Sequence, residues 1–236
     1  IIQFTGGPGG SRRDSDRENG YKEAFNTNGY LTSHRPLSNL CYTGFREQEM
    51  FVDSAVEEAL AIRKGNEGIT IIVGSSAGGV SALKAACRYS RLGGRIRYLG
   101  INDAAFLSSA NEVFFVPTVS INLLAVTRGH SINADVKENF YQAIGHTWQY
   151  NSTSPTKFHP YAEFHGELSG FVNVDLANRP KVLAVRAAYE AASRAAMGLP
   201  LPIAVRDRFA ATIHRAAGGS AENLIWARLS KLLAPN

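Results

Sequence analysis

Ser76 is the residue of this sequence whose type and surroundings best fit a nucleophile. It is the middle residue of the stretch GSSAG, which fits the pattern G-x-S-x-G. A β-branched, apolar run over 69–73 comes directly before this stretch, and a helical pattern over 80–87 follows it. A sharp turn between strand and helix is the context in which this pattern lifts a serine hydroxyl clear of the backbone, with small residues allowing the close approach. The sequence therefore predicts a nucleophilic serine, and the alternative is a Gly/Ser-rich turn that binds phosphate.

Asp103 is the candidate acid. It follows the apolar run over 95–101, which is the next strand that we expect after Ser76. A carboxylate just past the carboxyl end of that strand is well placed to orient a histidine. The alternative is an aspartate that caps a turn.

A serine hydroxyl is a poor nucleophile without a base within hydrogen-bond reach, and six histidines compete for that role. His165 ranks first, because it lies in a loop, just before an expected strand, that could fold over the carboxyl ends of the strands. His214, which lies inside a helical pattern, and His130 rank next. The others are His34, His146 and His159.

Two stretches could supply hydrogen bonds to an oxyanion. The amide of Ala77, at the expected helix start, would point at a developing negative charge. Gly6 and Gly7 follow an expected strand over 1–4, where a glycine-rich loop can provide a second amide. The same loop could cradle a phosphate, but it fits neither G-x-x-x-x-G-K-[ST] nor G-x-G-x-x-G before a clear helix.

The elements that must position these residues alternate between strand and helix along the chain. We therefore predict an α/β fold, with a doubly wound, mostly parallel sheet flanked by helices in three αβα layers. One domain over 1–236 is expected, with the helical region 180–236 as a cap or as the final crossover helices. Further expected strands lie at 170–176 and, as strand or short helix, 134–144; the expected helices are 47–63, 182–197, 204–217 and 221–233.

Composition sets broad limits on the function. Apolar residues make up 44% of the 236 residues, which is enough for a large core, and no apolar run is long enough to span a membrane. Two cysteines, Cys41 and Cys87, do not make a disulfide framework, and we expect Cys87 to be a buried thiol. The net charge is +5, and the positive surplus is local, because 179–236 holds nine Lys or Arg against three Asp or Glu. Such a region could meet a membrane surface, an acidic partner or nucleic acid, although a solvated helix face is the simpler interpretation.

The chain resembles the α/β-hydrolase fold and, within it, serine esterases and lipases. The matching pieces are GSSAG as the nucleophile elbow, FTGG (4–7) as the oxyanion loop and Asp103 in LGINDAAF as the acid. NFYQ (139–142) and GFVNVDL (170–176) look like two late strands of a bacterial subgroup of these enzymes.

This resemblance implies hydrolysis of a carboxylic ester through an acyl-enzyme on Ser76. The family's order is serine, acid, histidine, with the histidine usually in a loop soon after the last strand. Here the only histidine after Leu176 is His214, nearly forty residues on. Because this departs from the family's pattern, the predicted triad keeps the first-ranked histidine. It consists of Ser76, Asp103 and His165, with no metal and no organic cofactor. A small-molecule or lipid ester is the expected substrate; no nucleic acid is expected, the oligomeric state stays open, and the cytoplasm is slightly favoured.

Two other interpretations stay open. GSSAGG also resembles the elbow of patatin-like lipases, and DLANRP (175–180) is similar to their aspartate segment, although its two glycines are missing. That resemblance would make Asp175 the base in a Ser–Asp dyad. Alternatively, a hydrolase fold without its histidine could be a catalytically inactive binding or structural module.

Overall fold

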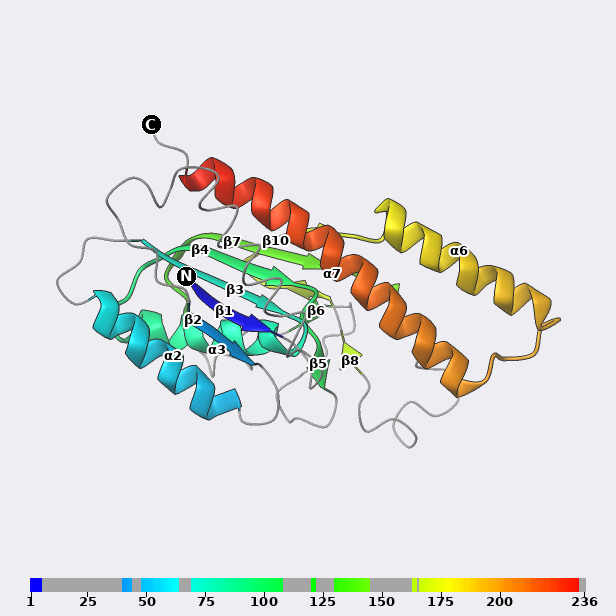
Figure 1. Ribbon diagram of the computed structural model, residues 1–236, viewed down its shortest axis with the longest axis horizontal. Helices are drawn as coiled ribbons and strands as arrows, with labels where there is room; N and C mark the ends of the chain where they lie inside the picture. The colour runs from blue at the N-terminus through cyan, green and yellow to red at the C-terminus, as the bar shows by residue number, and fades with distance from the viewer. Residues whose placement is uncertain are drawn as a thin grey trace.

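A six-stranded parallel sheet forms the centre of the molecule in a computed structural model of the chain (Figure 1). The structure describes residues 1–5, 40–43, 48–63, 69–107, 120–121, 130–144, 163–164 and 166–233. The sheet order is β10-β7-β4-β3-β1-β2. The strands are β1 (Ile2–Thr5), β2 (Leu40–Thr43), β3 (Thr70–Ser75), β4 (Ile96–Asn102), β7 (Ala134–Tyr141) and β10 (Val172–Asp175).

The order of the strands changes direction between β1 and β3. From β1 the chain moves outward to β2, whereas from β3 it moves through β4 and β7 to β10 on the other side. In open parallel sheets, such a switch point leaves a crevice at the carboxyl ends of the strands, where ligands bind. The other described strands form two short two-stranded sheets. In one, β5 (Phe106–Leu107) pairs with β8 (Glu163–Phe164), and in the other, β6 (Ser120–Ile121) pairs with β9 (Glu167–Leu168).

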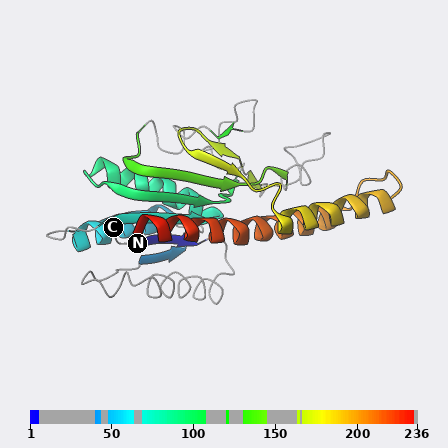
Figure 2. The ribbon, with the colours of Figure 1, turned by 90° about the horizontal axis from the view of Figure 1, so that it is seen from above.

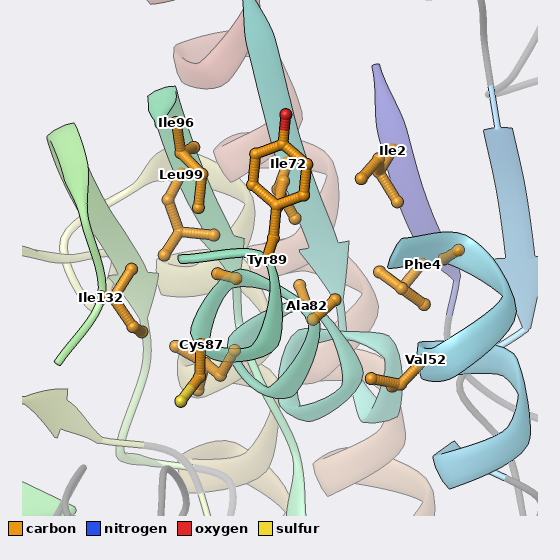
Figure 3. Packing of buried hydrophobic residues seen from close by; sticks show 14 of the residues in the cluster. Ile2, Phe4, Val52, Ile72, Ala82, Cys87, Tyr89, Ile96, Leu99 and Ile132 are labelled. Carbon is orange, nitrogen blue, oxygen red and sulfur yellow. The ribbon is translucent and has the colours of Figure 1, made fainter. Parts of the chain in front are cut away.

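Helices cover both faces of the sheet (Figures 1 and 2). On one face lie α2 (Gln48–Arg63) and α3 (Ala77–Arg91), whose buried side chains pack against β1, β3 and β4 (Figure 3). On the other face lie α7 (Ile203–Leu233) and α6 (Pro180–Ala195), which packs beside α7. The predicted α/β fold with a parallel sheet flanked by helices is thus confirmed, and the arrangement fits the three predicted layers.

The periodicity of α3 gives the expected buried face. Val80, Leu83, Ala86 and Cys87 are all buried. Cys87 belongs to the buried apolar cluster (Figure 3), and burial raises the pKa of its thiol despite the nearby arginines. The expected buried thiol is confirmed.

The prediction of two separate helices over 204–217 and 221–233 is wrong, because α7 runs unbroken from Ile203 to Leu233. One apolar stripe continues through the glycine pair 218–219 and faces the sheet. Its members are Ile213, Ala217, Ala221, Ile225 and Leu229, all at most 1% exposed. Two glycines cost a helix roughly 0.5–1 kcal/mol each, and the burial of this stripe outweighs that cost.

Candidate active site

Ser76 sits on a strained turn between β3 and α3. Its φ of 57° and ψ of −130° lie in a region that residues other than glycine rarely adopt, at a cost of about 1–3 kcal/mol. Three backbone hydrogen bonds hold it there. Ser76 N donates to Asn102 O at 3.0 Å, and Ser76 O accepts from Gly79 N at 2.9 Å and from Ala105 N at 3.1 Å. The backbone of Ser76 is therefore fixed between α3 and the end of β4.

Glycine at position 74 lets β3 and α3 meet at this turn. A Cβ on Gly74 would lie 2.4 Å from Gly78 O and 2.5 Å from the Cβ of Ala82. Both are fixed parts of α3, so neither can move aside at low cost. The predicted reason for small residues around Ser76, a close passage of strand and helix, is confirmed at Gly74.

Replacing Gly74 by alanine is expected to lower the free energy of unfolding by about 1–3 kcal/mol, because the added methyl group overpacks the junction. Gly219→Ala is the matched control, since nothing lies within 4 Å of a Cβ at that helical position. The control should be neutral or stabilising by up to about 1 kcal/mol. Urea unfolding followed by circular dichroism measures both, and equal midpoints for Gly74→Ala and the unmodified protein would contradict the prediction.

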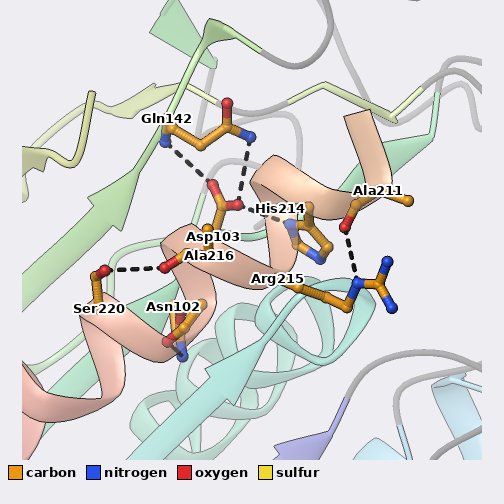
Figure 4. Close-up of polar contacts among 9 residues, drawn as sticks. Asn102, Asp103, Gln142, Ala211, His214, Arg215, Ala216 and Ser220 are labelled. Atoms are coloured by element: carbon orange, nitrogen blue, oxygen red, sulfur yellow. Dashed lines mark hydrogen bonds and ion pairs between the residues drawn. The ribbon is translucent and has the colours of Figure 1, made fainter. Parts of the chain in front are cut away.

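Asp103 lies directly after β4, beside the elbow, and is fully buried. Its own backbone takes a φ of 45°, and Asp103 N donates to Phe140 O at 2.7 Å. Its carboxylate is held by Gln142, the residue after β7. Gln142 N donates to Oδ1 at 3.1 Å and Gln142 Nε2 donates to Oδ2 at 3.4 Å (Figure 4).

His214 completes this buried cluster from α7. Its Nδ1 lies 2.7 Å from Oδ2 of Asp103, and its side chain is 20% exposed (Figure 4). An ionised carboxylate only accepts hydrogen bonds, so Nδ1 carries the proton, and Nε2 of the neutral ring has a lone pair. This is the tautomer that a general base at Nε2 requires.

Asn102 connects the elbow to the helix that carries His214. Its carbonyl oxygen accepts from Ser76 N, and its side-chain Nδ2 donates to Gly218 O at 3.1 Å. Gly218 lies four residues, about one helical turn, after His214. Ser76 and His214 are therefore both tied to the carboxyl end of β4, where Asp103 lies.

A second attachment fixes α7 further along the sheet. Arg228 donates through Nε to Oε1 of Glu138 at 2.9 Å, and the hydroxyl of Tyr98 donates to Oε2 of Glu138 at 3.0 Å. Glu138 and Tyr98 are buried. The hydrogen bonds to Glu138 raise the pKa of the Arg228 guanidinium, which therefore stays charged. Asn102 and Glu138 thus attach α7 to the sheet at two points, and these attachments define the position of His214 along the sheet.

The structure brings together some of the predicted residues and not others. Ser76 and Asp103 follow neighbouring strands, as expected, and among the described histidines it is His214 that lies beside Asp103. His165 lies outside the described residues, as do Gly6, Gly7, His34, His146 and His159. β1 pairs with β3 through Phe4 and Gly74, so the chain leaves β1 next to the elbow.

Two of the candidates lie away from the elbow. His130 is exposed and precedes the amino end of β7, a strand roughly 25 Å long whose other end faces Asp103. Asp175 ends β10, three strand positions or roughly 14 Å from β3. It is exposed, and its Oδ1 accepts from Ala177 N at 2.8 Å, which closes a local turn.

Sequence reasoning missed the roles of Gln142 and Asn102. Asn102 ends β4 and Gln142 follows β7. Polar residues at the carboxyl ends of parallel strands meet at one edge of the sheet, and this is the signal that could have identified both.

Tyr141, next to Gln142, donates to Oε1 of Glu167 at 3.0 Å. Burial raises the pKa of its phenol, so the hydroxyl stays a donor.

No family model and no curated protein matches this chain. Within the described part of the chain, no helix has both the length and the apolar character needed to cross a membrane. Because neither comparison found a match, the chemistry of the candidate site is inferred from the geometry of its residues.

Proposed function

We propose that this protein is a serine hydrolase of the α/β-hydrolase class that cleaves a carboxylic ester. The observation that carries the proposal is the hydrogen bond between His214 and the buried Asp103 at the end of β4, next to the strained Ser76 that follows β3. The chain order serine, aspartate, histidine is the order of this class. The site also lies at the switch point of the sheet, where such folds bind ligands.

In the proposed reaction, Oγ of Ser76 attacks the ester carbonyl carbon, and its proton passes to Nε2 of His214. Asp103 stabilises the imidazolium that forms. His214 then gives the proton to the leaving alkoxide as the C–O bond breaks, which leaves the acyl group on Ser76. A water molecule repeats the sequence, losing a proton to His214, and releases the carboxylic acid and free Ser76.

The amide of Ala77 is the proposed first donor to the oxyanion, because it is the first residue of α3 and directly follows Ser76. Gly6 and Gly7 are the proposed second source, because β1 ends beside the elbow strand. Loss of one such donor typically lowers kcat on the order of 10²–10³-fold.

The two other interpretations have less support. A Ser76–Asp175 dyad would need contact across three strand positions, and Asp175 is occupied by its own turn. An inactive binding module would explain a missing histidine, but the contact of His214 Nδ1 with Asp103 Oδ2 at 2.7 Å supports a histidine in the proposed site.

Labelling with a fluorophosphonate tests the proposal, because only an activated serine reacts quickly with it. We expect one covalent adduct, mapped to Ser76 by peptide mass spectrometry, and hydrolysis of p-nitrophenyl esters by the same preparation. Ser76→Ala should abolish both, whereas Ser75→Ala is the neighbouring control and should keep the adduct. Absence of an adduct on folded protein would overturn the hydrolase mechanism and favour the binding module.

A further inference from the structure

Helices α6 and α7 form a hairpin that extends past the carboxyl ends of the strands (Figures 1 and 2). Helix α6 packs against α7, and the rings of Tyr189 and Phe209 meet edge to face at 5.3 Å. Beyond this contact, the chain turns at Met197 and Gly198, whose φ angles are 49° and 84°. The hairpin therefore has a packed stem and a separate tip over 196–203.

The tip exposes large apolar side chains to solvent. Met197 is 89% exposed, Leu199 72% and Ile203 47%, and prolines 200 and 202 stand between them. Burial of such side chains would be favourable, and nothing in the stem covers them. An exposed apolar tip of this kind is suited to insertion into an apolar environment outside the protein.

Arginines surround the tip. Arg194 precedes it on α6, Arg208 follows it on α7, and both are exposed. Arg206 adds a third positive charge, and Asp207 is the one acidic residue between 191 and 208. Basic side chains beside exposed apolar ones complement the anionic headgroups and the acyl region of a lipid surface.

We propose that this tip docks the protein on an anionic lipid bilayer. A specific protein partner usually takes roughly 20–30 residues on each side, which is far more than the tip offers. Insertion into a bilayer needs only a few apolar side chains together with nearby positive charge. His214 lies eleven residues, roughly 16 Å, along α7 from Ile203, and the strands end on the side toward which the hairpin extends (Figure 1). Docking would therefore hold the candidate active site close to the lipid.

Vesicle flotation tests the docking separately from catalysis, because it can be done with the Ser76→Ala protein. We expect binding to phosphatidylcholine vesicles that contain 30 mol% phosphatidylserine, little binding to pure phosphatidylcholine, and release by 0.5 M NaCl. The double variant Met197→Ser/Leu199→Ser should lower the partition coefficient on the order of 100-fold. Arg194→Gln/Arg208→Gln should lower it roughly 30-fold.

The matched controls are Leu92→Ser and Arg91→Gln at the end of α3, where Leu92 is 62% exposed. Both controls should bind vesicles like the parent protein. Equal binding by the tip variants and the parent would overturn the proposal, and so would failure of the parent to float with anionic vesicles. Self-association that is lost with the tip variants, without vesicle binding, would identify the tip as a protein contact and also overturn it.

Discussion

Replacing His214 by alanine is expected to lower kcat/KM for an activated ester on the order of 10⁶-fold. Loss of the histidine from a serine triad costs about as much as loss of the whole triad, because the serine can no longer transfer its proton. His214 is the residue whose Nδ1 contacts Asp103, and no second described histidine reaches that carboxylate. Initial rates with a p-nitrophenyl ester and the rate of fluorophosphonate labelling measure the effect.

Alanine variants of His130 and His165 are the comparisons for His214→Ala. His130→Ala should keep full activity, because His130 lies beyond the amino end of β7. His165→Ala tests the residue that sequence reasoning ranked first. If His165→Ala removes activity and His214→Ala retains it, the assignment of the base to His214 is wrong, although the assignment of Ser76 would stand.

Replacing Asp103 by asparagine is expected to lower kcat/KM about 10⁴-fold. The two carboxylate oxygens accept from Gln142 N, Gln142 Nε2 and His214 Nδ1. An asparagine that keeps its carbonyl toward Gln142 N presents its NH₂ group to His214. The ring would then carry its proton on Nε2, where it cannot accept the proton of Ser76.

Asp175→Asn is the matched control, because it removes a carboxylate from the same edge of the sheet without touching His214. It should keep activity and labelling, apart from a small change in stability. Loss of labelling in Asp175→Asn together with its retention in Asp103→Asn would favour the Ser–Asp dyad instead. Thermal unfolding of both variants should accompany the kinetics, because Asp103 is fully buried and its replacement also disturbs packing.

The sequence by itself determined the strand–turn–helix around Ser76 and the position of Asp103 after the next strand. The β-branched run before GSSAG and the helical pattern after it are local signals, and Gly74 is needed because strand and helix touch there. The position of Asp103 also followed from local pattern, since it is the residue after a buried strand. Such features depend on backbone geometry and burial within a few residues, so a sequence can reveal them.

Only the tertiary structure decided which histidine stands beside Asp103. His214 is 111 residues away in the chain, inside a helix for which two separate helices, 204–217 and 221–233, were expected. Its place depends on the apolar stripe of α7 packing on the sheet, and on the attachments through Asn102 and Glu138. These contacts join distant segments, so no local pattern around His214 could indicate them.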